Sequence, residues 1–219
     1  SPDTVSHGKF DRAGKFNGVD QQIVIPDIDA ATNITVSAWV WRDPSHSDTI
    51  AYSGILNKWT PTDGEWSLGI DNGDLSMWAE INGVVTGEDT TIYFPKGEWV
   101  HVAFTYDGND FIGYMNGAVI INETRVGAID NEITPIKIGH DDTYFKGLID
   151  EVAIWQRTLS ATEISDLYKR GALKLKTQVR ACTASNCVGE DFVGPSGSTT
   201  AFFSELNNTS NALPSVDAG

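Results

Sequence analysis

The chain has 219 residues, a formal net charge of −15 at pH 7 and 40% hydrophobic residues. This composition argues against disorder, and the length suits one β domain with a short appendage. A surface this acidic repels nucleic acid and anionic membranes and favours cations such as calcium. No apolar run reaches the roughly 18 residues of a membrane-spanning helix, so we expect neither nucleic-acid binding nor membrane insertion.

Short runs of alternating polar and apolar residues dominate the chain from residue 22 to 156. Ile34, Val36 and Ala38, for example, fall on one face of a strand, because side chains alternate across a pleated strand. Dipeptides such as Asn116-Gly117 separate the runs and suit tight hairpin turns. Strands at this spacing predict an all-β antiparallel sandwich or barrel. The expected strands are 22–26, 34–41, 54–58, 66–70, 75–80, 99–106, 111–115, 118–122, 136–139 and 145–156.

One helix is expected over residues 161–170. Ser160 and Glu163 have the spacing of a capping box, Ile164 and Leu167 begin an apolar stripe, and Gly171 suits the end of a helix. This helix closes a main domain that we place at 1–171.

Residues 172–219 form a C-terminal tail of different character. Residues 173–181 alternate like one strand with a basic outer face, and a polar stretch follows. Cys182 and Cys187 form either a short-range disulfide in an oxidising compartment or two free thiols. The tail is too short and polar to build its own core, so it docks on the main domain, belongs to a neighbouring subunit or is mobile.

Three segments together resemble the laminin-G-like, concanavalin A-like lectin/glucanase jelly roll of extracellular proteins. They are 14–26, the pair 34–40 and 97–108, and 145–168. The resemblance implies a two-sheet antiparallel jelly-roll sandwich of six or seven strands per sheet. It also implies a mostly non-catalytic module that binds glycans or proteins, often with calcium, outside the cell or at its surface.

The chain departs from that family at its start. An extra strand usually precedes the Phe16-Asn17-Gly18 motif by some tens of residues, and only thirteen residues precede Gly14 here. The missing strand would pair beside the closing strand at 145–155. We hypothesise that the tail strand 173–181, or a strand from another subunit, fills that slot.

Asp150 is the sharpest single candidate for a site. It lies in phase with Leu148, Val152 and Ile154, and a carboxylate in an apolar phase is costly without a partner. Calcium is a natural partner because it binds carboxylate and carbonyl oxygens. The resemblance places a structural calcium between this acid and the Phe-Asn-Gly motif, which implies as ligands Asp150 with Asn17 or neighbouring carbonyls, and Asp43. The alternative is an Asp that caps backbone amides or faces solvent.

Two further groups are candidates for ligand binding. The loop 139–144 carries two acids, an imidazole and a phenol that suit a sugar or a second cation; the alternative is a solvated acidic turn. Aromatic side chains outside the clearest core phases suit stacking on a sugar ring; the alternative is a place in the core. The candidates are His140, Asp141, Asp142 and Tyr144 in the loop, and Trp59, Trp66 and Trp78, with Tyr52 and Tyr93, among the aromatics.

No motif supports catalysis. A retaining glycosidase on such a fold needs two carboxylates about 5–5.5 Å apart. Asp150 and Glu151 are adjacent and face opposite sides of a strand, so they do not meet this need. The sequence therefore predicts a non-enzymatic, secreted or surface-displayed, calcium-stabilised module that binds a glycan or a surface protein. The rival interpretation is a structural subunit of an adhesin or filament, self-associating through its tail by strand addition.

Overall fold

The fold is described from a computed structural model in which residues 2–5, 8–28, 32–59, 64–172, 176–177, 180, 191–193, 198–199 and 203–204 are placed. The chain divides into two compact units, Ser1–Lys169 and Arg170–Gly219, and each is described by itself. The predicted domains 1–171 and 172–219, and the docking of the tail, stay predictions. Among the placed residues, no helix has the length and apolar character needed to cross a membrane.

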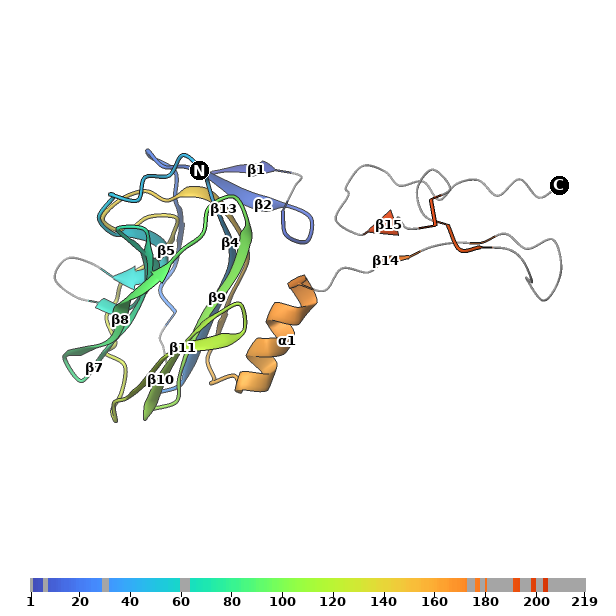
Figure 1. The fold of residues 1–219 in the computed structure, drawn as a ribbon. Helices are drawn as coiled ribbons and strands as arrows, with labels where there is room; N and C mark the ends of the chain where they lie inside the picture. The colour runs from blue at the N-terminus through green and yellow to red at the C-terminus, as the bar shows by residue number, and fades with distance from the viewer. Residues whose placement is uncertain are drawn as a thin grey trace. The chain divides into compact units, whose positions relative to one another are not determined.

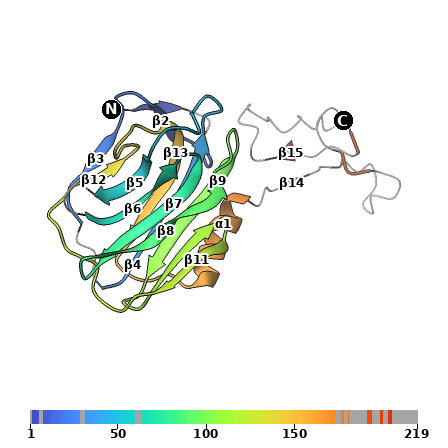
Figure 2. The same cartoon turned by 60° about the vertical axis from the view of Figure 1, so that its left-hand side comes forward.

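The first unit is a sandwich of two antiparallel sheets, as Figures 1 and 2 show. The all-β jelly-roll prediction is therefore confirmed. One sheet has seven strands in the order β1 (Asp3–Val5), β2 (Ala13–Asn17), β13 (Lys146–Trp155), β4 (Ile34–Arg42), β9 (Trp99–Tyr106), β10 (Asp110–Met115) and β11 (Ala118–Thr124). The other has six strands in the order β3 (Ile23–Ile25), β12 (Ile136–Ile138), β5 (Ser53–Trp59), β6 (Gly64–Asp71), β7 (Asp74–Ile81) and β8 (Val84–Tyr93).

The core lies between the two sheets and follows from the alternation along the strands. Trp66 of the six-stranded sheet packs on Phe104 of the seven-stranded sheet, with ring centroids 6.0 Å apart, and Phe104 stacks on Phe111 at 5.3 Å. Leu75, Met77, Ala79 and Ile81 point inward from β7, so Ser76, Trp78 and Glu80 lie on the outer face of its sheet.

The helix α1 (Ala161–Ala172) covers the outer face of the seven-stranded sheet. Ile164 and Leu167 pack there against Ala103 and Tyr114. The capping box forms as expected, because the Ser160 N–H donates to Glu163 at 2.8 Å and the Glu163 N–H donates to the Ser160 hydroxyl at 3.3 Å.

The hairpin turn predicted at Asn116-Gly117 is confirmed. Both residues have positive φ, +51° and +76°, and join β10 to β11. The predicted strands recur within a few residues of their expected ends, but within the first unit the sequence missed β1, β2 and β8.

The hypothesis about the opening strand is wrong. The edge of the closing strand β13 is paired with β2 of the same unit, in the register Lys146↔Asn17 to Ile149↔Gly14. Strand β1 then pairs with β2 in turn. The slot is filled by the chain's own first residues, so neither the tail nor another subunit is needed there.

Of the second unit, two short strands are placed. β14 (Lys176–Thr177) pairs antiparallel with β15 (Phe203–Ser204). The rest of the predicted strand 173–181, apart from residue 180, lies outside the described residues, and so do Cys182 and Cys187. The disulfide stays a prediction.

Candidate functional site

The outer face of the six-stranded sheet brings together most of the residues proposed for ligand binding. Asn57, Ser67 and Trp78 stand side by side across β5, β6 and β7, because Asn57 pairs with Ser67 and Ser67 with Trp78. Lys137 of β12 extends this row, since it pairs with Asn57. The row runs across the sheet and mixes an amide, a hydroxyl, an indole and an ammonium group.

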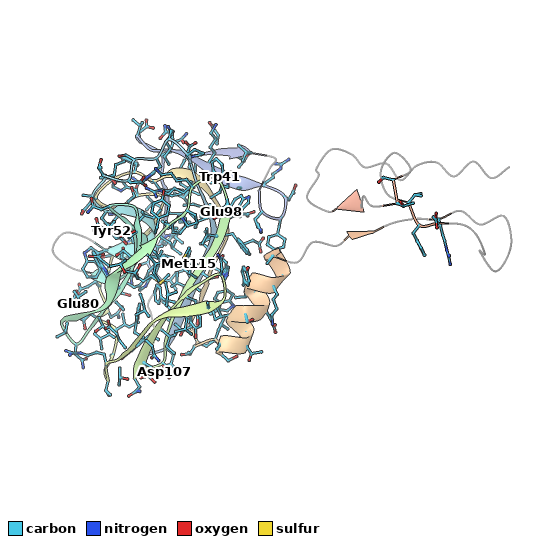
Figure 3. The ribbon with its side chains drawn as sticks, in the orientation of Figure 1. Trp41, Tyr52, Glu80, Glu98, Asp107 and Met115 are labelled. Atoms are coloured by element: carbon cyan, nitrogen blue, oxygen red, sulfur yellow. The ribbon has the colours of Figure 1, made fainter. Side chains whose placement is uncertain are left out.

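Three aromatic side chains lie against one another on this face. The rings of Trp59 and Trp78 meet edge to face with centroids 5.9 Å apart, and Tyr52 packs on Trp78 at 5.1 Å. Tyr52 is labelled in Figure 3 beside the strands of this sheet. Both tryptophans are half-buried, so each keeps part of its ring at the surface.

Hydrogen bonds connect these aromatics to the loop 139–144. The Tyr52 hydroxyl lies 2.7 Å from the Ser67 hydroxyl, which donates to Oδ2 of Asp141 at 3.2 Å. The Asn57 side chain donates to the His140 carbonyl at 2.5 Å. The loop and the tryptophans, which the sequence offered as separate candidates, therefore form one surface. We call Tyr52, Asn57, Trp59, Ser67, Trp78, His140 and Asp141 the outer-face cluster.

Glycines make room for this arrangement. A Cβ at Gly69 would come within 2.5 Å of the Tyr52 ring and hydroxyl, so only glycine lets the phenol lie over β6. A Cβ at Gly54 would come within 2.7 Å of Asp141 and His140, so only glycine lets the loop approach β5. A glycine inside a strand often marks such a close approach.

The remaining loop residues hold the loop in place or reach solvent. The Thr143 hydroxyl lies 2.9 Å from that of Ser53 and donates to the Tyr52 carbonyl at 2.8 Å. The rings of His140 and Tyr144 lie 4.1 Å apart. Asp142 is exposed. The loop thus presents two acids, one anchored and one free to meet solvent.

The environment of Asp141 changes its chemistry. The pKa of Asp141 is raised to about 6, mainly by burial and to a smaller extent by the neighbouring Asp142, against the hydrogen bond from Ser67, which lowers it. Burial, with Lys137 nearby, lowers the pKa of His140. At neutral pH the cluster therefore presents an ionised carboxylate beside a neutral imidazole. The carboxylate accepts hydrogen bonds from hydroxyl groups, and the imidazole has one nitrogen that donates and one that accepts.

The prediction that Trp66 binds a ligand is wrong. Its side chain is 0% exposed and belongs to the core between the sheets, so it does not reach a ligand on the outer face. The alternation that puts Ser67 on the outer face puts Trp66 inside.

The prediction that Asp150 points to the apolar side of its strand is also wrong. A β-bulge at Glu151, where φ is +48°, shifts the register of β13, so Ile149 and Ile154 both face the core. Asp150 pairs with Trp39 and lies on the outer face of the seven-stranded sheet. Its Oδ2 accepts the backbone N–H groups of Lys9 and Phe10, and its Oδ1 accepts that of Glu151.

The residues expected to bind calcium do not fit a calcium site. The Asp150 carboxylate already accepts three backbone N–H groups, so its charge is stabilised without a cation. Asn17 pairs with Lys146, four residues along β13 from Asp150, or about 13 Å at the rise of a strand. Asp43 binds Ser45, and the Lys146 ammonium also binds Ser45, at 2.7 Å. No group of three or more His, Cys, Asp or Glu side chains suited to a metal occurs among the placed residues.

The sequence analysis did not identify Asn57 and Ser67, because their short polar side chains belong to no motif. Gly54 and Gly69, each inside an expected strand or next to it, were the features that could have indicated a binding surface here. The backbone at such positions admits another group at close range.

Comparison with known proteins agrees with the fold. A family model described as the concanavalin A-like lectin/glucanase superfamily matches residues 17–165, more than half of the chain. The chain therefore belongs to this superfamily.

Two curated relatives are pappalysin-1 of Mus musculus, 28% identical over 182 residues, and of Homo sapiens, 27% identical over 184 residues. The matches take in 73% and 74% of this chain and 11% of each relative. The chain thus spans about a tenth of the length of these relatives.

Several solved structures share the sandwich. One is domain 4 of AbnA, an extracellular arabinanase from Geobacillus stearothermophilus, in complex with arabinotriose: TM-score 0.62, 24% identity, covering 77% of this chain and 81% of that one. Another is the binding domain of Paraclostridial Mosquitocidal Protein 1: TM-score 0.65, 18% identity, covering 77% and 45%. The botulinum neurotoxin serotype D binding domain gives 0.63 at 16% identity, covering 81% and 50%. At these identities the likeness concerns the fold.

Proposed function

We propose that this chain is a non-catalytic carbohydrate-binding module, displayed outside the cell, that binds glycan on the outer-face cluster. The observation that carries the proposal is the contact between two half-buried indoles and a hydrogen-bonded Tyr–Ser–Asp chain. An indole stacks on the C–H face of a sugar ring, and the polar groups beside it accept and donate hydrogen bonds to its hydroxyls.

The negative charge of the surface limits the class of glycan that can bind. Asp141, Asp142 and Asp89 all act on the Tyr52 hydroxyl electrostatically, and the whole chain carries a net charge of −15. Such a field disfavours sulfated or uronic-acid glycans. We therefore propose a neutral glycan.

The comparisons support a binding role without fixing the ligand. Two of the proteins with this fold are named as binding domains, and a third was solved with arabinotriose bound. In pappalysin-1, the region that is similar to this chain makes up 11% of a much longer protein. The filament interpretation loses its main structural argument, because β2 fills the slot beside β13.

A binding titration tests the proposal. A panel of neutral oligosaccharides that includes arabinotriose is screened first, and the best ligand is titrated by calorimetry. We expect Trp78→Ala to weaken binding at least about tenfold, or ~1.4 kcal/mol, because the stacking surface is lost.

Trp41→Ala is the matched control, since Trp41 is also half-buried but lies on the seven-stranded sheet. Equal losses in the two variants, or no binding to any neutral glycan in the panel, would contradict the proposal.

A further inference from the structure

A buried lysine meets two carboxyl groups at one end of the six-stranded sheet. The Lys58 side chain near the end of β5 is 0% exposed, and its Nζ lies 2.5 Å from Oδ1 of Asp27. The same Nζ donates to Oε1 of Glu65 at the start of β6, whose side chain is also 0% exposed. Asp27 follows β3, so the contact joins strands that lie two places apart in the sheet.

The hydrogen bonding of this cluster is incomplete. Oε1 of Glu65 also accepts the N–H of Glu132 at 2.7 Å, whereas Oε2 of Glu65 is buried with no hydrogen-bond partner. Oδ1 of Asp27 has the Lys58 ammonium as its ion-pair partner. A cluster that served only as a structural ion pair would satisfy Oε2 of Glu65 as well, because a buried unpartnered polar atom is costly.

The protonation states allow a proton to move within the cluster. Burial raises the pKa of Glu65, and it does so despite hydrogen bonds from Lys58 and Glu132 that lower it. Burial also lowers the pKa of Lys58, but the bonds to Asp27 and Glu65 raise it by more. The raised pKa of Lys58 favours its ammonium form, so the amine becomes neutral only by passing a proton to a neighbouring group, and the raised pKa of Glu65 suits its carboxylate to accept that proton.

We propose that Lys58 and Asp27 condense into an intramolecular amide, with Glu65 as the residue that transfers the proton. The Lys58 ammonium passes one proton to the Glu65 carboxylate, and the neutral Nζ attacks Cγ of Asp27 to form the new N–C bond. Glu65 gives that proton to a carboxyl oxygen of Asp27 and then carries a second proton from Nζ to the same oxygen, and the C–O bond breaks as water leaves. Overall, one ammonium and one carboxylate become an amide and a water molecule, without oxidation or reduction.

The arrangement assigns different roles to the two acids. Glu65 is fully buried and held by the Glu132 N–H, which suits a fixed proton carrier. The Asp27 side chain is 26% exposed, so the water that leaves it has a path to solvent. Asp27 is therefore the group attacked, and Glu65 remains unmodified.

Such a bond would strengthen a weak edge of the sheet. β3 has three residues and pairs with β12 alone, and Val24 is exposed. An amide between residues 27 and 58 closes a loop that contains all of β4. Closing a loop of this length restricts the unfolded chain and stabilises the folded one. The inference is independent of glycan binding.

Intact-mass measurement of the full chain, denatured and with its cysteines reduced, tests the proposal. We expect the wild-type mass to be lower than the mass calculated from the sequence by one water. Lys58→Arg keeps a cation at the site but removes the amine, and Glu65→Gln keeps the shape but removes the proton carrier. Both variants should have their full calculated masses, with circular dichroism confirming that they fold.

Tryptic digestion locates the bond and keeps the test decisive if a variant fails to fold. Trypsin does not cut after an acylated lysine, so residues 16–42 should appear joined to residues 43–96. A wild-type chain that is folded, has its full calculated mass and is cut after Lys58 would overturn the proposal. A Glu65→Gln variant that still lacks one water would overturn the role of Glu65.

Discussion

Oδ2 of Asp150 accepts the backbone N–H of Lys9 at 2.7 Å and so connects residues that are 141 positions apart in the sequence. The same oxygen accepts the N–H of Phe10, and Oδ1 accepts that of Glu151, whose φ is +48°. One carboxylate therefore attaches the loop between β1 and β2 to the closing strand and stabilises the bulge in that strand.

Removing this carboxylate should destabilise the sandwich. We expect Asp150→Ala to lower the free energy of unfolding by about 1–3 kcal/mol, because its backbone donors lose their charged acceptor. Urea unfolding measures the change. Asp142→Ala, which removes an exposed carboxylate, is the control and should change it by less than about 0.5 kcal/mol.

The same variant separates amide capping from calcium binding. If Asp150 stabilises the fold by accepting backbone N–H groups, Asp150→Ala lowers the free energy of unfolding equally in EDTA and in calcium. A loss seen only in calcium would show that the acid is a metal ligand and that the assignment from hydrogen bonds is wrong.

Two buried histidines should make the domain sensitive to acid. Burial lowers the pKa of His101 to about 4, and burial with Arg42 nearby does the same for His46. An unfolded histidine titrates near 6.5, so the unfolded chain binds protons first as the pH falls from 6.5 to 4, and stability falls over that range. Asp141, with its raised pKa, opposes this trend in part below pH 6.

NMR titration of the imidazole protons checks each histidine separately. We expect the His101 and His46 signals to stay those of the neutral ring down to about pH 5 in the folded protein. His101→Gln should reduce the loss of stability between pH 6.5 and 4. An ordinary midpoint near 6.5 for either ring would contradict the expectation.

Glycan affinity should depend on pH through Asp141. The ionised carboxylate is the stronger acceptor for sugar hydroxyls, so a bound glycan favours the ionised form. Binding should therefore weaken as the pH falls through about 6, the pKa of the free protein. Calorimetric titration at pH 5 and pH 7.5 measures this, with Asp141→Asn as the control, whose weaker binding should not change over that range.

Gly69→Ala should disturb the site without breaking the core. The added methyl group would overlap the Tyr52 ring, which must move and release Ser67 and Trp78. We expect glycan binding to weaken severalfold while the unfolding free energy falls by about 1–3 kcal/mol. Gly83→Ala meets no neighbouring atom and is the control for binding. Unchanged binding in Gly69→Ala would show that Tyr52 plays no part.

The sandwich could be predicted from the sequence because polar and apolar residues alternate along most of its strands. It predicted β9 (Trp99–Tyr106) to the residue and the helix with its capping box, since both depend on local spacing. It failed at β8, where Thr86-Gly87-Glu88-Asp89 interrupts the pattern that marks a strand. It failed at β2 because five residues with one clear apolar pair give little periodicity.

The site was predicted in part, for a similar reason. The loop 139–144 and the tryptophans were visible as chemical types, and the fold brought them together through Ser67, which no pattern marks. Asp150 was misplaced because a bulge at Glu151 changes the phase of the strand. A single inserted residue is invisible to an argument from alternation and reverses every face after it.

The most direct test of glycan binding on the outer-face cluster is an indole N–H spectrum of the seven tryptophans during titration with the best neutral oligosaccharide. The signals of Trp59 and Trp78 should move with the ligand concentration, while those of Trp39 and Trp155, which face away on the other sheet, stay in place. Movement confined to Trp39 and Trp155, or no movement at any indole, would contradict the account.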